Sequence, residues 1–263
     1  MTAIQIRVLG PLEVEAGGGV RPLGGPVPRR LLAALTLRGG AVMSDDELTD
    51  LVWVDGPPSD ALAALRVAVS RLRNGLGEQL GGLLCRRATG YQLAVGPAQL
   101  DTSTFVRAVT AGRAALRSGD AECAERLLGS ALDSWRGRPW EDLGDRPSLL
   151  GPRATFVELR DVAFEELQEA RLARGDAPGA VAALSAAVIE SPYRERRWEL
   201  LALGLYRTGR QTQALAELRT LRQLLDTELG VAPGPALRDL EQRILRHDAA
   251  LIDIADPAAA ATG

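Results

Sequence analysis

The sequence contains no lysine, and this absence excludes several catalytic mechanisms at once. All 31 basic residues of the 263-residue chain are arginine. A Walker A phosphate loop, a Schiff base and the ATP contact of a protein kinase each require a lysine amine. The only histidine, His247, stands beside Asp248 in a helical stretch and has no nucleophile motif near it. We therefore predict a protein that is not an enzyme and has no catalytic residues and no cofactor.

Cysteines and long apolar runs are also scarce. Cys85 and Cys123 lie far apart without a CxxC spacing, and one histidine cannot build a multi-histidine metal site. The sequence thus predicts two reduced thiols and no metal. No apolar run has the length needed to cross a bilayer, and the N-terminus does not have the pattern of a signal peptide. These features predict a cytoplasmic protein that makes no membrane contact.

Between residues 27 and 95 the sequence has the pattern of three short helices followed by a hairpin. The first apolar run ends at Gly39-Gly40, where glycine tolerates the left-handed conformation that closes a helix. Ser44 precedes three acidic residues, which places a capping side chain and negative charge at the positive end of a second helix. We expect Ser59 to cap a third helix that runs to about Gly77.

The third helix has one apolar and one mixed face. The stripe predicted to be buried recurs at steps of three and four residues and comprises Leu62, Leu65, Val69, Leu72 and Leu76. The opposite face comprises Ala63, Arg66, Val67, Ser70, Arg71 and Asn74, with Arg73 at the margin. Arginine can pair with phosphates or guanine edges, and Ala63 or Val67 could meet a thymine methyl group. A solvated face in an arginine-rich chain would look similar, so this helix alone leaves both interpretations open.

The segment after this helix, residues 83–95, reads as two extended runs around a glycine turn. Arg86, Arg87 and Tyr91 lie beside the turn and suit a hairpin that clamps phosphates. Residues 59–91 contain five arginines and two acidic residues, although the whole chain has a net charge of −3. Positive charge is therefore local. The block predicts a winged helix-turn-helix, which sets a helix into the major groove of DNA.

Two alternating segments near the N-terminus, residues 4–8 and 12–15, predict strands that form a small sheet against the three helices. Residues 1–97 carry 10 arginines and 9 acidic residues, a net charge of +1. Residues 98–263 carry 21 arginines and 25 acidic residues, a net charge of −4. This difference suits a DNA-binding part joined to a part that meets another molecule.

The second part contains a repeat. Gly119, Gly175 and Gly209 each mark a tight turn between helices, and the last two are 34 residues apart, the tetratricopeptide period. Small or apolar residues recur five before, five after and nine after these glycines: Ala114, Ala170, Gly204; Ala124, Ala180, Ala214; Leu128, Leu184, Leu218. Stacked helix pairs form a superhelix with a concave face for protein or ligand contact. A dimerisation or spacer element is the alternative.

We predict a mostly α protein with three parts. Residues 1–97 form a winged helix-turn-helix with a small β-sheet and a wing hairpin. Residues 98–252 form an all-α, tetratricopeptide-like repeat domain, and residues 253–263 form a flexible tail. The tail is expected to fray because it is of low complexity.

The sequence resembles the Streptomyces antibiotic regulatory protein family in its small form, a response-regulator-type winged helix followed by a bacterial transcriptional activator domain. The resemblance covers residues 4–251. The stretches that carry it are Ile6–Val14, Val69–Arg73, Gly90-Tyr91, Leu132–Gly137, Ser191–Arg196, Gly209–Leu215 and Glu228–Gly234.

The resemblance implies a transcription factor, usually an activator, of a specialised-metabolite (antibiotic) gene cluster. It implies as partners double-stranded DNA with tandem direct repeats and RNA polymerase holoenzyme, in a nucleoid-associated protein. The resemblance also leaves open a homodimer on the DNA. It also implies that Ser70, Arg71, Arg73 and Arg87 lie at the DNA. Our candidate DNA-binding residues are Arg29, Ala63, Arg66, Val67, Ser70, Arg71, Arg73, Asn74, Arg86, Arg87 and Tyr91.

One departure from the family pattern bears on specificity. Relatives usually have an arginine, an asparagine and a threonine early in the third helix, where this chain has Leu62, Ala63 and Ala64. The change predicts either an operator read with more methyl contact or weaker affinity. Two other functions stay open, a repressor with the same fold and a helical-repeat adaptor with weak DNA binding.

Overall fold

The computed structural model describes residues 4–54 and 56–252, so the predicted tail, residues 253–263, lies outside the described residues. The chain forms two compact units. The first unit contains the residues up to 108 together with residues 130–160, and the second contains residues 109–129 together with those from 161 onward. Neither unit begins or ends at the boundary of residues 97 and 98 that the sequence suggests.

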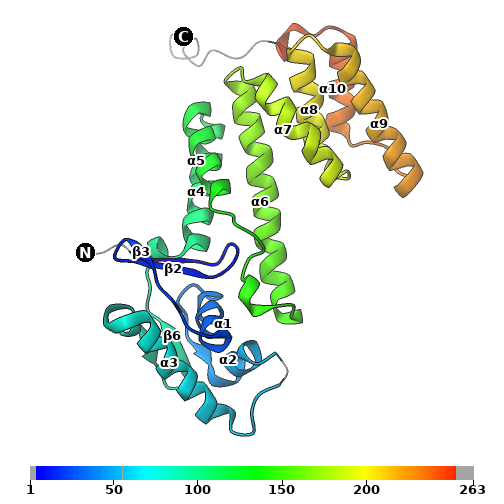
Figure 1. The fold of residues 1–263 in the computed structure, drawn as a ribbon. Coiled ribbons are helices and arrows are strands. Elements are labelled where there is room, and N and C mark those ends of the chain that lie inside the picture. Colours follow the sequence, from blue (N-terminus) through cyan, green and yellow to red (C-terminus); the bar gives the residue numbers. More distant parts are fainter. Residues whose placement is uncertain (1–3, 55, 253–263) are drawn as a thin grey trace. The chain divides into compact units, whose positions relative to one another are not determined.

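The first unit begins with two small antiparallel sheets and three helices (Figure 1). One sheet has the strand order β1-β2-β3, and the other has the order β4-β6-β5. The elements are β1 (Gln5–Arg7), β2 (Glu13–Ala16), β3 (Gly19–Val20), α1 (Pro26–Thr36), β4 (Met43–Ser44), α2 (Asp45–Val52), α3 (Ala61–Gly81), β5 (Leu84–Arg86), β6 (Gly90–Leu93) and η1 (Pro97–Gln99).

Local chemistry explains the helix ends. Ser44 begins α2 with a capping box, because its hydroxyl accepts the Glu47 N–H while the Glu47 carboxylate accepts the Ser44 N–H. This side chain–backbone bonding lowers the pKa of Glu47 below its ordinary value. The predicted cap of α3 is wrong: Asp60, and not Ser59, accepts the Ala63 N–H at 2.9 Å. Helical geometry breaks at Gly77, where φ is 75°.

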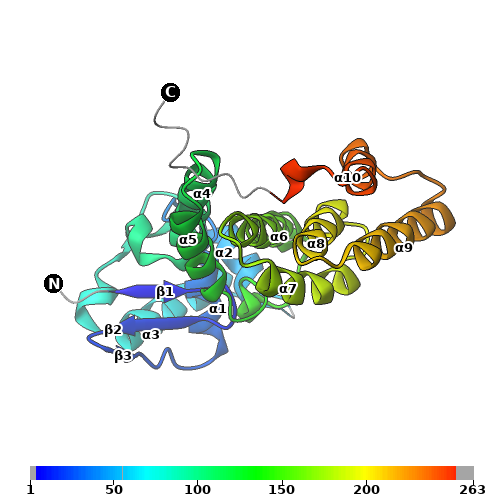
Figure 2. The same cartoon turned by 90° about the horizontal axis from the view of Figure 1, so that it is seen from above.

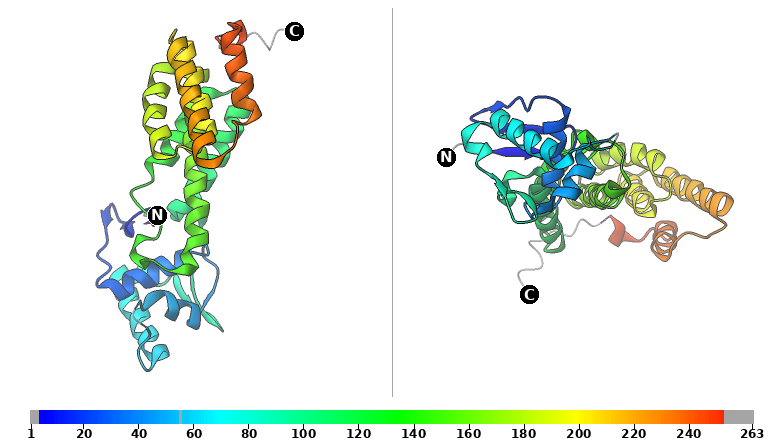
Figure 3. Two further views of the ribbon diagram at one scale, coloured as in Figure 1. Left: turned by 90° about the vertical axis from the view of Figure 1, so that its right-hand side faces the viewer. Right: turned by 90° about the horizontal axis from the view of Figure 1, so that it is seen from below.

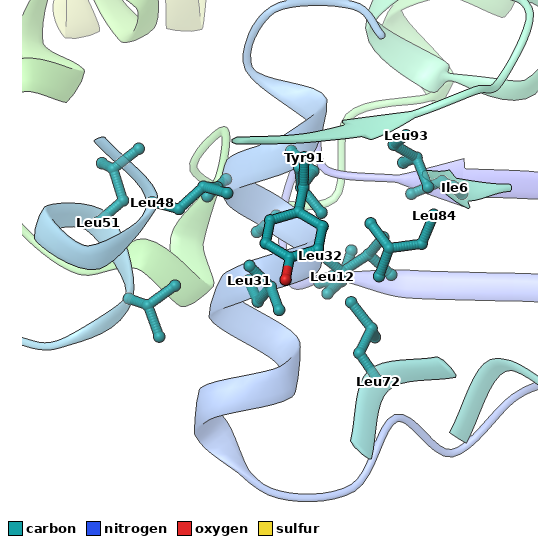
Figure 4. Close-up of a cluster of buried hydrophobic side chains, with 14 of the residues drawn as sticks. Ile6, Leu12, Leu31, Leu32, Leu48, Leu51, Leu72, Leu84, Tyr91 and Leu93 are labelled. Carbon is teal, nitrogen blue, oxygen red and sulfur yellow. The ribbon is translucent and has the colours of Figure 1, made fainter. Parts of the chain in front are cut away.

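One hydrophobic core joins both sheets to the three helices, as Figure 4 shows. Ile6 and Leu12 from the N-terminal strands are buried with Leu31 of α1 and Leu72 of α3. The predicted packing of these strands against the helices is therefore confirmed. The predicted stripe of α3 needs one correction, because Leu62 is 48% exposed. It lies in the first turn, where α3 extends past the edge of the core.

Residues beyond 97 complete this core. Trp140 is 2% exposed, and its indole N–H donates to the Thr36 hydroxyl in α1 at 2.9 Å. The Asp101 carboxylate accepts the backbone N–H groups of Val8 and Leu9 at 2.7 and 2.8 Å, although burial raises its pKa. The two sheets and three helices thus share their core with residues 130–160.

The remaining helices form helical hairpins, as the repeat predicts (Figures 2 and 3). The turn glycines Gly119, Gly175 and Gly209 have φ values of 82°, 84° and 75°. The elements are α4 (Asp101–Arg117), α5 (Ala121–Asp133), η2 (Glu141–Leu143), α6 (Pro147–Ala173), α7 (Ala177–Glu190), α8 (Glu195–Arg207), α9 (Gln211–Leu229), α10 (Pro235–Leu245) and η3 (Ala249–Leu251).

Small residues let these helices approach, with one exception. Ala124, Ala180 and Ala214 are fully buried, as predicted. Ala114 is exposed, so the predicted contact in the first repeat is wrong. Gly112 has that role instead, since a Cβ added there would lie 2.7 Å from a carbon of a leucine side chain in α5.

Candidate nucleic-acid interface

The outer face of α3 is the largest part of the candidate interface. Because successive residues are about 100° apart, Leu65, Val69 and Leu72 share one side, and all three are buried. Val67, on the other side, is 50% exposed. The predicted outer-face residues are all exposed, namely Ala63, Arg66, Val67, Ser70, Arg71, Arg73 and Asn74.

Cations flank this face. Arg66 and Arg71 form no ion pair or side-chain hydrogen bond within residues 4–54 and 56–252, which leaves their charges free for phosphate or base. Arg73 is already engaged, because its guanidinium donates to the Leu84 carbonyl at 2.6 Å and ties α3 to β5. Arg73 therefore holds the helix against the wing, although the residue as a whole is exposed.

The wing is the hairpin of β5 and β6. Arg87 is exposed, and its Nε donates to the Gln92 side-chain oxygen at 2.8 Å. Gln92 in turn donates to the Gly40 carbonyl at 2.8 Å, so two residues steady this cation at the wing turn. Arg86 differs, because both of its terminal nitrogens donate to the Asp45 carboxylate. This bonding raises the pKa of Arg86 above its ordinary value. Its charge is largely neutralised before any DNA arrives.

Two predicted interface residues need correction. Tyr91 is only 6% exposed, and Figure 4 shows its ring among the core leucines rather than at the wing surface. Its outer contact is Arg86, whose guanidinium carbon lies 4.8 Å from the ring centre. Tyr91 thus packs in the core beneath the wing and supports it from that side. Strand alternation was the available signal, since Leu93, two residues on, points to the same side.

Arg29 also has an internal role. Its Nε donates to the Asp142 carboxylate at 2.6 Å, and a terminal nitrogen donates to the Leu12 carbonyl at 2.8 Å. Asp142 also accepts the Leu12 N–H at 2.5 Å. These bonds join α1, the N-terminal sheet and η2, and they occupy the charge that the sequence assigns to DNA. The Arg29 side chain is 32% exposed and that of Asp142 is 14% exposed.

Other kinds of site are not found in the described residues. Across residues 4–54 and 56–252, no group of three His, Cys, Asp or Glu side chains could hold a metal ion. Within the same residues, no helix has the length and apolar character to span a membrane.

A helix-turn-helix whose exposed helix α3 carries arginines that are unpaired within the described residues, beside a basic hairpin, defines a winged-helix DNA-binding protein. Residues 25–93 match the family model described as transcriptional regulatory protein, C terminal. Residues 100–245 match the bacterial transcriptional activator domain. The chain belongs to the Streptomyces antibiotic regulatory protein family of DNA-binding transcriptional regulators, and the resemblance seen in the sequence is confirmed.

Several relatives extend this result. The transcriptional regulator RedD of Streptomyces coelicolor is 39% identical over 94% of this chain and 72% of its own length. The regulatory protein AfsR of the same species is 39% identical over 96% of this chain, which spans only 25% of AfsR. The solved structure of Mycobacterium tuberculosis EmbR in complex with low affinity phosphopeptide has a TM-score of 0.86 and 34% identity. It covers 100% of this chain and 71% of its own.

Proposed function

We propose that this regulator activates a specialised-metabolite gene cluster by binding tandem direct repeats near the promoter and recruiting RNA polymerase holoenzyme. The observation that supports it best is the exposed face of α3, where Arg66 and Arg71 have no partner among the described residues, together with the wing cation Arg87. Similarity to RedD over most of both chains supports a regulator of this kind. Such a regulator acts by binding and not by catalysis. It binds the chromosome in the cytoplasm.

We assign different tasks to the three cations. Arg71 and Arg87 neutralise phosphates, so each contributes affinity on any sequence. Arg66 projects from the second turn of α3 and reaches a guanine edge, where its guanidinium matches the two acceptors. Ser70 and Asn74 lie on the same face, in the third and fourth turns of the helix, and add hydrogen bonds to bases or backbone.

The second unit offers the polymerase a surface of paired charges. A cavity of about 1200 Å³ lies among α6, α8, α10 and the turn between α4 and α5. Within it Arg196 donates to Glu169 and to Glu199, each at 2.7 Å. Side chains fixed by such ion pairs present hydrogen-bonding groups in set positions to a protein partner.

Footprinting of the full-length protein on the promoters that flank its own gene tests this function. An activator is expected to protect repeated sites upstream of the promoter, and transcription from that promoter with purified polymerase should then rise. Protection across the promoter core with reduced transcription would favour the repressor. The absence of any protection would favour the adaptor.

A further inference from the structure

We infer that Val67, together with Ala63, reads the 5-methyl groups of thymine in the major groove. This inference rests on the proposed DNA contact of α3 and names the base chemistry that the helix recognises. It assigns a specificity role to apolar side chains on a face where DNA-binding residues are usually polar.

In its first two turns the outer face of α3 is apolar along the direction of Ala63 and Val67, and Ser70 and Asn74 continue this direction further along the helix. On a helix of 3.6 residues per turn, Ala63 and Val67 project within about 40° of each other and one turn apart. Both are exposed, and Val67 remains 50% exposed although it is β-branched and apolar. Leu62, which the sequence assigns to the core, is 48% exposed, but it projects about 100° away from Ala63 and lies outside this direction. The first two turns of α3 therefore present an apolar strip to solvent.

The cations lie beside this strip and not on it. By the same helical geometry, Arg66 projects on one side of the Ala63–Val67 direction and Arg71 on the other. Phosphates lie along both edges of the major groove, and bases lie along its floor. With Arg71 on a phosphate at one side of the strip and Arg66 on a guanine edge at the other, Ala63 and Val67 point at the neighbouring base edges.

Only one major-groove group suits such a strip. Thymine displays a C5-methyl group there, whereas every other distinguishing group is a hydrogen-bond donor or acceptor. The Val67 side chain offers no hydrogen bond, so pairing it with a guanine or cytosine edge would leave polar atoms without partners. The N-terminal residues of a recognition helix are the ones that contact bases, and the strip occupies that end of α3.

Replacing thymine by deoxyuridine isolates this contact, because it removes the methyl group and leaves the hydrogen-bonding edges unchanged. Duplexes selected from a random library by the full-length protein serve as the probe. The best duplex is then remade with each thymine replaced singly by deoxyuridine. For the unmodified protein, at least one replacement should weaken binding roughly fourfold, the effect of one buried methyl-sized group.

The variant Val67→Ala should bind the thymine and deoxyuridine duplexes at that position alike, since its truncated side chain no longer reaches the methyl group. Ile189→Ala is the matched control, an apolar truncation at a residue of α7 that is 80% exposed. It should keep the full thymine preference.

Three outcomes would overturn the inference: a selected duplex without thymine, indifference to every replacement, or an unchanged preference in Val67→Ala. In each of these cases salt-dependent DNA binding by the protein would leave the proposed function intact. Failure to select any duplex would instead refute the DNA contact itself, and the inference with it.

Discussion

Arg29 and Arg71 should show opposite consequences when each is replaced by alanine. The sequence assigns both to DNA, but the structure engages only Arg29 internally. Arg29→Ala removes a 2.6 Å charge-assisted bond to Asp142 and a 2.8 Å bond to the Leu12 carbonyl. Hydrogen bonds to charged groups contribute about 1.5–3 kcal/mol each and neutral ones about 1 kcal/mol.

The partial exposure of this pair reduces that sum. The Arg29 side chain is 32% exposed, so water recovers part of the interaction. We expect Arg29→Ala to lower the free energy of unfolding by roughly 2 kcal/mol, with the half-buried charge of Asp142 left behind. Its DNA affinity should keep the salt dependence of the unmodified protein, because the same phosphates are still neutralised.

Arg71→Ala should behave in the reverse way. Its side chain is exposed and unpaired within the described residues, so stability should change by less than about 0.5 kcal/mol. The slope of the logarithm of its binding constant against the logarithm of salt concentration should become less steep by about 1. One phosphate is then no longer neutralised by the protein. Urea unfolding and a binding series across salt measure both quantities. A stable Arg29→Ala with a reduced salt slope would refute the internal role derived for Arg29.

Three further changes test the packing and the wing. Gly204→Ala should cost about 1–3 kcal/mol in thermal unfolding, because the added Cβ would lie 2.8 Å from a valine methyl group. Its control Gly129→Ala meets nothing within 4 Å and should stabilise α5 by about 1 kcal/mol, so equal effects would contradict the helix packing. Asp45→Asn should release Arg86 and steepen the salt slope by up to about 1, and an unchanged slope would argue against the neutralised wing cation. Asp101→Ala should cost about 1–3 kcal/mol for each of two buried N–H groups left unpaired, and a change within about 0.5 kcal/mol in urea unfolding would rule out that role.

Local patterns predicted the elements of this fold well. Ser44 before three acids marked the start of α2, and leucines at helical spacing marked the buried side of α3. Glycines in the sequence marked the turns between the repeat helices, and the structure gives them positive φ. Each of these signals depends on residues that are close together in the sequence, so it can be recognised without the structure.

The errors arise where distant residues decide. The partner of Arg29 is Asp142, 113 residues later, and no local pattern connects them. The shared core was missed for a similar reason, because Trp140 donates a hydrogen bond to Thr36, which lies 104 residues earlier. Leu62 continues the helical stripe, but the core ends before it. Sequence reasoning therefore located the exposed face of α3 and the wing hairpin, but it did not reveal which of their side chains already bond to the rest of the protein.

The most direct test of the account is binding of the full-length protein and two variants to a selected duplex and its scrambled counterpart across a salt series. The unmodified protein should lose affinity for both duplexes as salt rises and should prefer the selected one. Arg87→Ala should weaken both alike, and Arg66→Ala should reduce the preference by roughly 1–3 kcal/mol. Affinity that does not change with salt, or equal shifts on both duplexes in both variants, would contradict DNA reading by α3 and clamping by the wing.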